Sequence, residues 1–249
     1  MQLQVEVRNK TFSSFEDSGQ VKALEDVKFT VDSGEFLCLF GPSGCGKTTL
    51  LNIIAGLDTH FDGAVSLKNS GKVERELRIG YVFQNPRLLP WRTVEENLKI
   101  VLSADQIQSG IIDELLVSAE LVSFRNTYPS QLSIGMQRRV SLMRAFSIQP
   151  DLLVMDEPFV SLDQRMENNL HQVLLDYWQS SAPSVLFVTH HIREALKLAT
   201  RLLVFSSRPG KIILDIPVEL PYPERKNPEV FSDYVSQLIE ENPGILQNS

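Results

Sequence analysis

Residues 36–48 read Phe-Leu-Cys-Leu-Phe-Gly-Pro-Ser-Gly-Cys-Gly-Lys-Thr, and this stretch decides the fold. The apolar run from Phe36 to Phe40 predicts a buried strand, and Lys47 to Leu57 carries apolar residues at helical spacing. The segment between them fits G-x-x-x-x-G-K-[ST] in the strand–loop–helix context that this motif requires. The stretch therefore predicts an α/β domain with a phosphate-binding loop after a core strand.

The loop residues suit the phosphates of a nucleotide. Glycines let backbone N–H groups turn onto the β- and γ-phosphate oxygens, and the helix amino terminus adds positive partial charge. Lys47 would reach the same phosphates, and the Thr48 hydroxyl would ligate Mg²⁺. The predicted nucleotide-binding residues of the loop are Gly41, Pro42, Ser43, Gly44, Cys45, Gly46, Lys47, Thr48 and Thr49. The alternative is a glycine-rich turn that matches the motif by accident. The motif does not identify the family, because kinases, GTPases and many ATPases share this loop.

Two adjacent carboxylates end a second apolar run, Leu152 to Met155. Strand alternation predicts that Asp156 and Glu157 point in different directions and can take different roles. Asp156 would hold Mg²⁺, and Glu157 would orient and deprotonate the attacking water. Ordinary carboxylates at a strand end are the alternative, which a phosphate loop in the same chain disfavours.

Length, cysteine usage and charge limit the class of protein. A chain of 249 residues suits one large α/β domain or one domain with a subdomain. Cys38 and Cys45 lie in an apolar run and in the glycine-rich loop, which argues against a structural disulfide and for a reducing cytosol. The formal net charge of -7 gives no basic field, so nucleic acid is not an expected partner.

No apolar run approaches the roughly 20 residues that span a bilayer. The start, Met1 to Lys10, lacks the apolar core of a signal peptide, so we expect a chain that is not exported. Any membrane role would then depend on a partner.

The remaining pattern predicts a mainly parallel sheet interrupted by helices. Alternation at Leu3, Val5 and Val7, and again from Val27 to Val31, predicts half-buried strands at the amino terminus. Helical patterning fills residues 93–146, with Thr93 and Glu96 as a capping-box pair. The predicted elements after Pro150 are strand 152–155, a helix from about 164, strand 184–189, helix 192–199, strand 201–206, an extended connection 217–228 and helix 229–241.

Residues Leu132-Ser-Ile-Gly-Met-Gln137 resemble the signature sequence of ATP-binding-cassette (ABC) ATPases, Leu-Ser-Gly-Gly-Gln, which lies shortly before the second acidic strand. Other elements of that family appear in order around it. Gln84 is similar to the Q-loop glutamine, Ser161-Leu-Asp163 to the D-loop, and His190 to the switch histidine. Phe12 is the aromatic best placed to stack on adenine, with Phe15 as a competitor. The resemblance covers nearly the whole chain, from Phe12 to about Pro223.

The resemblance implies a P-loop NTPase (RecA-like) core with a mainly parallel sheet, an amino-terminal antiparallel β part and an inserted helical subdomain. The implied boundaries within one ABC ATPase domain, 1–249, are core 1–88 and 149–216, helical subdomain 89–148 and carboxyl-terminal extension 217–249. It implies that Ser133 and Gly135 contact the γ-phosphate of ATP held by the opposite subunit, so that the site is completed in a dimer.

By the same resemblance, Gln84 would touch Mg²⁺ or water and link the site to a membrane partner, and His190 would sense the γ-phosphate. The nucleotide-binding residues that it adds are Phe12, Gln84, Ser133, Gly135, Met136, Asp156 and Asp163. The implied catalytic residues are Glu157, His190 and Gln84, and the implied Mg²⁺ ligands are Thr48, Gln84 and Asp156. Taken alone, Ser133 would be a helix cap, Gln84 a loop amide and His190 a neutral core histidine.

The chain departs from the family pattern at three positions. Ile134 replaces the first signature glycine, and Met136 replaces the usual glutamine, while Gly135 remains. We therefore expect a competent site. His191 stands where many relatives carry aspartate, and an idle surface side chain is its plainer interpretation.

Three segments resemble the importer branch that serves nitrate, alkanesulfonates, taurine, bicarbonate and thiamine-precursor pyrimidines: Gln84 to Trp91, Ser207 to Lys211 and Leu220 to Arg225. The expected function is the hydrolysis of ATP to energise an importer for a small anionic or polar solute. Implied partners are a second cassette in a homodimer or mixed pair, two polytopic permease subunits that dock near Gln84 and Trp91, and a solute-binding protein, at the cytoplasmic face of the plasma membrane. Trp91 could instead be a plain core aromatic.

The competing class is an ABC ATPase not coupled to transport, working in repair, translation or cluster assembly. Members of these groups usually carry two cassettes or long coiled-coil inserts, which this chain lacks. A small-molecule kinase or GTPase would not account for Leu132 to Gln137.

Overall fold

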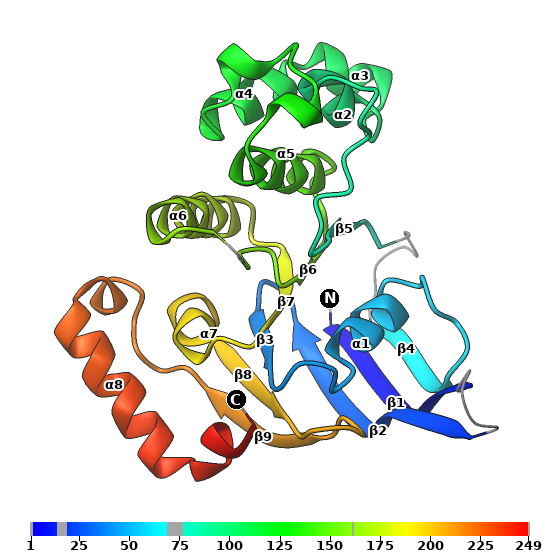
Figure 1. The fold of residues 1–249 in the computed structure, drawn as a ribbon, viewed down its shortest axis with the longest axis vertical. Coiled ribbons are helices and arrows are strands. Elements are labelled where there is room, and N and C mark those ends of the chain that lie inside the picture. The colour runs from blue at the N-terminus through cyan, green and yellow to red at the C-terminus, as the bar shows by residue number, and fades with distance from the viewer. Residues whose placement is uncertain (1, 14–18, 69–76, 161, 249) are drawn as a thin grey trace. The chain divides into compact units, whose positions relative to one another are not determined.

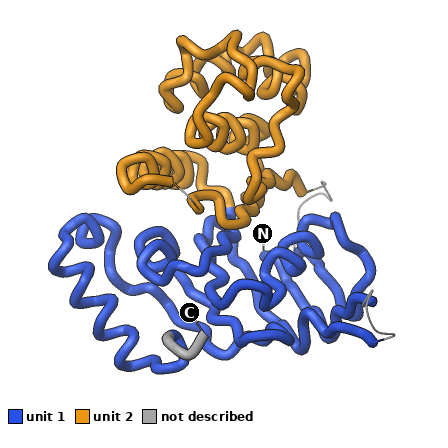
Figure 2. The backbone as a smooth tube through the Cα atoms, viewed as in Figure 1, with its two compact units in different colours: residues 1–74, 184–249 blue, residues 75–183 orange. Residues whose placement is uncertain are grey.

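The computed structural model describes residues 2–13, 19–68, 77–160 and 162–248. The chain forms two compact units, one of Met1–Glu74 with Ser184–Ser249 and one of Arg75–Pro183 (Figure 2). Both units combine strands with helices, which confirms the α/β class. Among the described helices, none is long and apolar enough to cross a membrane.

An antiparallel sheet opens the first unit. β1 (Gln2–Ser13) lies between β2 (Gln20–Asp32) and β4 (Asp62–Lys68), and it pairs antiparallel with both (Figure 1). Leu3, Val5 and Val7 are buried and alternate with half-buried neighbours, as the sequence pattern predicted. The sequence did not predict β4, because no residue of that strand is fully buried and its apolar signal is weak.

A parallel sheet in the same unit has β3 (Phe36–Phe40) between β7 (Ser184–Thr189) and β8 (Arg201–Phe205). β9 (Ile212–Pro217) pairs antiparallel with β8. Every residue of β3 and β7 is buried, as is typical of parallel strands covered on both faces. α1 (Lys47–Ile54) follows β3 and α7 (Ile192–Leu198) follows β7, so the connecting loops emerge at the same carboxyl edge of the sheet.

The helix predicted from Lys47 to Leu57 is shorter than expected and ends at Ile54. Gly56 adopts a left-handed φ of 72°, and the Leu57 N–H turns back to the Asn52 carbonyl at 2.8 Å. This backbone turn, which periodicity does not register, ends the helix.

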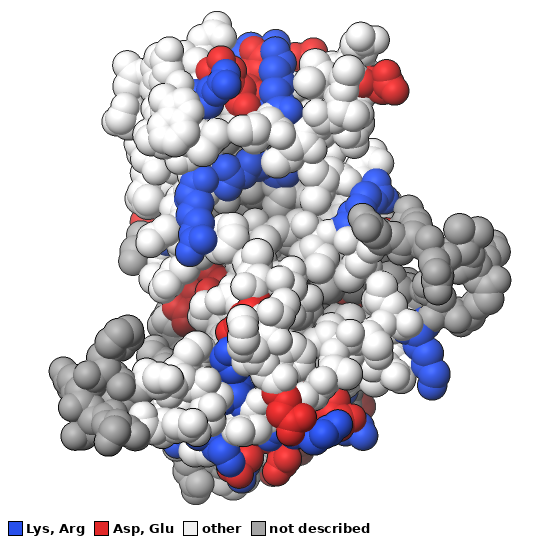
Figure 3. All heavy atoms as spheres, turned by 90° about the vertical axis from the view of Figure 1, so that its right-hand side faces the viewer, with Lys and Arg blue, Asp and Glu red and all other residues white. Residues whose placement is uncertain are grey.

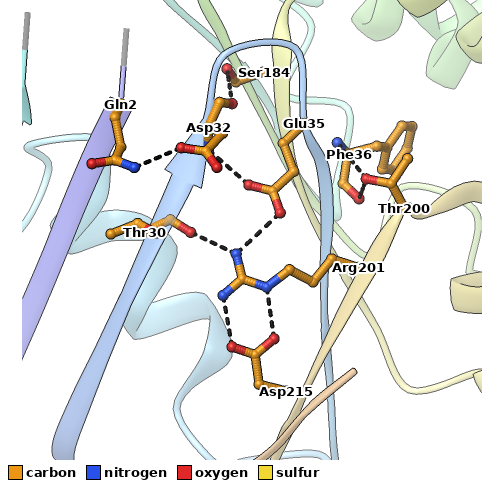
Figure 4. Close-up of polar contacts among 9 residues, drawn as sticks. All are labelled: Gln2, Thr30, Asp32, Glu35, Phe36, Ser184, Thr200, Arg201 and Asp215. Carbon is orange, nitrogen blue, oxygen red and sulfur yellow. Dashed lines mark hydrogen bonds and ion pairs between the residues drawn. The ribbon is translucent and has the colours of Figure 1, made fainter. Parts of the chain in front are cut away.

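Arg201 ties the two sheets of the first unit together (Figure 4). Its guanidinium donates to both carboxylate oxygens of Asp215 at 2.7 Å, to Glu35 Oε1 at 3.1 Å and to the Thr30 carbonyl at 3.0 Å. A nearby hydroxyl, Ser184 Oγ, donates to the Asp32 carbonyl at 2.9 Å. The bidentate pair and the Glu35 contact join β8, β9 and the connection between β2 and β3.

The segment after β9 was predicted as an extended connection, but part of it is folded. It contains a 3-10 turn at Glu224–Lys226 and leads into α8 (Pro228–Glu241), and a further 3-10 turn spans Pro243–Asn248. The buried Arg225 donates to the Ala199 carbonyl and the Leu220 carbonyl at 2.7 Å each. These bonds hold the segment against the end of α7, a long-range effect that its proline-rich composition did not reveal.

The second unit pairs β5 (Ile79–Val82) in parallel with β6 (Leu152–Asp156). Its helices are α2 (Val94–Lys99), α3 (Ala104–Gln108), α4 (Ile111–Ser118), α5 (Ile134–Ser147) and α6 (Gln164–Ser181), with 3-10 turns at Val122–Phe124 and Pro129–Gln131. The capping box of Thr93 and Glu96 is present at the start of α2, as predicted. Gly80 lets α5 approach β5, because a Cβ there would lie 2.8 Å from the Ala145 carbonyl oxygen.

Candidate nucleotide-binding site

The loop between β3 and α1 depends on its glycines. Gly44 and Gly46 have φ of 78° and 105°, in the left-handed region that other residues adopt only at a cost. At Gly46 a Cβ would also lie 2.8 Å from the Ala23 carbonyl oxygen. The backbone conformation of the loop therefore explains why glycine occupies positions 44 and 46.

Lys47 lies inside this loop. Its side chain is 4% exposed, and Nζ donates to the carbonyls of Gly41 and Pro42 at 2.6 and 2.8 Å. Among the described residues, no side chain caps the amino terminus of α1, so the first N–H groups of that helix have no capping side chain there. Thr48 is exposed and Thr49 is half-buried in the same first turn. The arrangement offers an ammonium group and backbone donors to an anion at one place.

His190 lies beside the loop in the same unit. β3 and β7 are parallel neighbours whose last residues, Phe40 and Thr189, are paired, so Gly41 and His190 both follow directly at the edge of the sheet. The rings of His190 and His191 are 4.0 Å apart between centroids, and the His191 N–H donates to Thr189 Oγ1 at 3.0 Å. Thr189 Oγ1 in turn donates to the buried Glu194, which fixes the start of α7.

Phe12 presents an accessible ring on β1. The residue is 44% exposed, and its ring lies 4.7 Å from Nζ of Lys10, which is itself buried and paired with Asp58 at 2.7 Å. Phe15, the other aromatic predicted to compete for adenine, lies outside the described residues.

The cysteines near this site, Cys38 and Cys45, are both buried free thiols, and burial raises the pKa of the Cys38 thiol.

The acidic pair of the second unit occupies a sharp turn. Asp156 ends β6 and is 6% exposed, whereas Glu157 has a left-handed φ of 44°. Strand alternation was predicted to give the two carboxylates their different directions. That explanation was wrong, because β6 ends at Asp156 and Glu157 lies in the turn that follows. The Asp156 charge adds to burial, the larger cause, in raising the pKa of Tyr81.

Gln84 lies at the carboxyl end of β5 and contacts the acidic turn. Its Nε2 donates to Glu157 Oε2 at 3.4 Å, a long bond between partly exposed groups. Arg138 of α5 supports the same turn by donating to the Pro158 carbonyl and, at 3.5 Å, to the Glu157 carbonyl. The structure thus brings Gln84 and Glu157 together, and it adds Arg138, which the sequence patterns did not single out.

The segment from Gln84 to Trp91 is held by side chains from two helices. Arg144 of α5 donates to the carbonyls of Pro86 and Arg87 at 3.0 Å each. Asn97 of α2, which is fully buried, accepts from the Leu89 N–H at 2.8 Å. Trp91 is 69% exposed, so the interpretation of Trp91 as a core aromatic is wrong.

The signature residues occupy the start of α5. Ser133 is an exposed N-cap whose Oγ accepts from the Met136 N–H at 3.2 Å. Gly135 is buried, and a Cβ there would lie 2.5 Å from Met166 Sδ of α6. Ile134, which replaces a signature glycine, is 50% exposed.

Asp163, which was assigned to the D-loop by sequence resemblance, is the N-cap of α6 and accepts from the Met166 N–H at 2.9 Å. Ser161, the first D-loop residue, lies outside the described residues.

The predicted site residues divide between the two units. Phe12, residues 41–49 and His190 belong to the first unit, and Gln84, Ser133, Gly135, Met136, Asp156, Glu157 and Asp163 belong to the second. Basic and acidic side chains are interspersed on the face shown in Figure 3, so neither sign of charge dominates that face.

Comparison with known proteins resolves the family. The family model for ABC transporters matches residues 24–160 of the chain. The aliphatic sulfonates import ATP-binding protein SsuB of a Bacillus cereus strain is 39% identical over 97% of this chain and 96% of its own length. The chain belongs to the ABC transporter family. The nitrate import ATP-binding protein NrtD of Synechocystis sp. (strain PCC 6803 / Kazusa) is 36% identical, over 96% of this ABC protein and 95% of its own length.

Solved ABC cassettes share the fold. The dimeric structure of the ATP-binding cassette MJ0796, in a post-hydrolysis state bound to ADP and Pi, superposes with a TM-score of 0.74 at 29% identity. The alignment covers 89% of this chain and 100% of that one. The comparisons confirm the family, the fold class and the ATPase activity predicted from the sequence, and they give no support to the alternative of an ABC ATPase outside transport.

Proposed function

We propose that the protein is the Mg-ATP-hydrolysing subunit of an importer for a small oxyanion, and that it works as one half of a nucleotide-sandwich dimer. The observation that carries the proposal is the phosphate loop, in which Lys47 is buried between loop carbonyls beside the uncapped start of α1. On ATP binding, the ammonium group would exchange these carbonyls for the β- and γ-phosphates.

Mg²⁺ would be held by oxygen atoms of Thr48, Asp156 and Gln84. A hydroxyl, a carboxylate and an amide carbonyl are hard ligands of the kind that this ion prefers, and the metal would neutralise charge on the phosphates. Asp156 ends β6 and is the one carboxylate of the three, so we assign it the largest share of metal binding.

Glu157 is the proposed general base. Glu157 occupies the left-handed turn that follows β6, and Gln84 donates to one of its carboxylate oxygens at 3.4 Å. An amide that binds one carboxylate oxygen orients the second to accept a proton from water, which is the geometry that general-base catalysis needs. His190, next to the loop at the carboxyl edge of β7, would donate to the γ-phosphate.

Ser133, Gly135, Met136 and Asp163 would serve the nucleotide of the partner subunit. Ser133 presents an exposed hydroxyl at the amino terminus of α5, and the amino end of a helix favours an anion. The dimeric cassette structures support this arrangement by analogy.

The importer assignment follows from relatives named for aliphatic sulfonate and nitrate import. Both solutes are small oxyanions, which sets the proposed substrate class. Trp91 would anchor a cytoplasmic helix of a permease subunit, because it is 69% exposed on a segment held by Arg144 and Asn97. A solute-binding protein would complete the importer, with this subunit at the cytoplasmic face of the membrane.

Two measurements test this function. Calorimetry should give micromolar binding of Mg-ATP to the parent chain and none to the Lys47→Ala variant. Co-purification from membranes should recover a polytopic permease with the parent and less of it with Trp91→Ala, while ATP affinity stays unchanged. Unaltered ATP affinity of Lys47→Ala would remove the loop from the site, and recovery of a repair or translation complex would remove the importer assignment.

A further inference from the structure

Arg208 attaches the loop after β8 to the phosphate loop. Its Nε and Nη2 both donate to the Gly44 carbonyl oxygen, at 3.0 and 2.9 Å. Gly44 lies in the middle of the phosphate loop, and its left-handed φ of 78° exposes this carbonyl to the guanidinium. Two N–H groups of a cation that donate to one carbonyl form charge-assisted hydrogen bonds, which are stronger than hydrogen bonds between neutral groups.

The loop that carries Arg208 is itself fixed. Ser206 Oγ donates to the Pro209 carbonyl at 3.0 Å and accepts from the Lys211 N–H at 3.0 Å. The Gly210 N–H donates to the Ala23 carbonyl at 2.9 Å, and a Cβ at Gly210 would lie 2.2 Å from the Cys45 carbonyl oxygen. The backbone of the loop after β8 therefore packs closely against the phosphate loop, and these contacts fix the position of Arg208.

The bond from Arg208 to the Gly44 carbonyl also orients the N–H on the other side of the same peptide group, which belongs to Cys45. The peptide group is planar and trans, so its C=O and the following N–H point in opposite directions. Holding the Gly44 carbonyl at Arg208 directs the Cys45 N–H to the opposite side, where it donates to the Pro42 carbonyl oxygen over a long 3.4 Å. Lys47 Nζ donates to this same oxygen at 2.8 Å, so the two donors converge on one carbonyl, and on ATP binding both would exchange it for a phosphate oxygen.

We propose that Arg208 is a positioning residue for nucleotide binding: it orients the Gly44–Cys45 peptide so that the Cys45 N–H is ready to donate to a phosphate oxygen. The proposal rests on the function proposed above for the phosphate loop. Arg208 acts through the loop backbone, and withdrawal of electron density from the carbonyl also makes the N–H a better donor.

A diffuse effect of positive charge is the competing explanation, because Arg208 is exposed. The two explanations differ in their response to salt and to lysine. A charge effect would disappear at high ionic strength and be restored in full by lysine. An oriented bond to one carbonyl would persist in salt, and lysine would restore only part of it, because one ammonium does not reproduce the two converging N–H groups.

The test compares Arg208→Ala, Arg208→Lys and Lys211→Ala in the full chain. Lys211 is the matched control, since it lies on the same loop and loses the same charge, but it pairs with Glu25 at 2.7 Å. Calorimetry with Mg-ADP and Mg-ATP gives the dissociation constants. Steady-state hydrolysis separates KM from kcat, and hydrogen exchange of the peptide that covers residues 41–47 reports on the loop.

We expect Arg208→Ala to raise the dissociation constants of ADP and ATP about 3–10-fold, the scale of one charge-assisted bond that acts indirectly. KM should rise with kcat unchanged, exchange in residues 41–47 should accelerate, and Lys211→Ala should match the parent. Parental affinity of Arg208→Ala, or a difference that vanishes in about 0.5 M salt, overturns the proposal. If Lys47→Ala also binds ATP normally, the loop is not the nucleotide site and the proposed function fails first.

Discussion

Replacement of Glu157 by glutamine should remove hydrolysis and leave nucleotide binding intact. The exchange keeps the size of the side chain and its ability to accept a bond from Gln84, but it removes the capacity to take a proton. We expect kcat to fall by about 10²–10⁴-fold, the usual contribution of a positioned base. That loss corresponds to about 2.7–5.4 kcal/mol of activation free energy.

Little else should change on this exchange. The Gln84–Glu157 bond is 3.4 Å long and partly exposed, and the amide oxygen of glutamine can still accept it, so its weakening costs no more than about 0.5 kcal/mol. Arg138 donates to backbone carbonyls of the turn, and these remain. The free energy of unfolding should therefore stay within about 0.5 kcal/mol of the parent value.

The assay pairs steady-state hydrolysis with size-exclusion chromatography in Mg-ATP. The Glu157→Gln protein should elute as a dimer in Mg-ATP and as a monomer in ADP. Glu120→Gln is the matched control, because Glu120 is also a left-handed glutamate, with φ of 57°, and forms an ion pair with Arg139 at 3.1 Å. Turnover near the parental rate in Glu157→Gln would refute the role of Glu157 as base.

Three further predictions address the other parts of the site and the fold. Lys47→Ala should abolish ATP binding at micromolar nucleotide by calorimetry, with an unchanged circular dichroism spectrum, since the loop keeps its glycines. Ser133→Arg should bind ATP normally and lose turnover, because Ser133 is exposed; parental hydrolysis by this variant would contradict the sandwich dimer. Tyr222→Phe should lower the free energy of unfolding by about 1 kcal/mol at pH 8, because Tyr222 donates to the Leu198 carbonyl at 2.6 Å. Burial raises the pKa of Tyr222 to about 12, above the ordinary value near 10, so this contribution is complete below pH 10 and falls as the pH approaches 12. Urea unfolding that shows the same difference at pH 8 and pH 11 would contradict this reasoning.

Buried elements could be predicted from the sequence, and half-exposed ones could not. β3 and β7 match their predicted bounds, Phe36–Phe40 and Ser184–Thr189, because all their residues are apolar or buried. β4 has no fully buried residue, and β9 has one. Strands of this kind are set by pairing with neighbours, which periodicity along the chain does not report.

The candidate site was predictable where its motif is local. Loop residues 41–48 carry their chemistry within one short stretch, and their glycines explain their geometry. The contact of Gln84 with Glu157 instead depends on the pairing of β5 with β6, which places Val82 opposite Met155. The sequence near Glu157 does not predict a left-handed turn, and the sequence near Arg208 does not predict its bond to the distant Gly44.

The side chains of Arg225 and Tyr222 set limits on how this chain can be shortened or fused. They donate to the carbonyls of Ala199 and Leu198 in the end of α7, the helix that begins just after His190. A chain cut after β9 would leave these carbonyls without protein donors, at about 1–3 kcal/mol for each one that stays buried. A label or fusion partner therefore belongs beyond the 3-10 turn Pro243–Asn248, where it leaves the end of α7 in place.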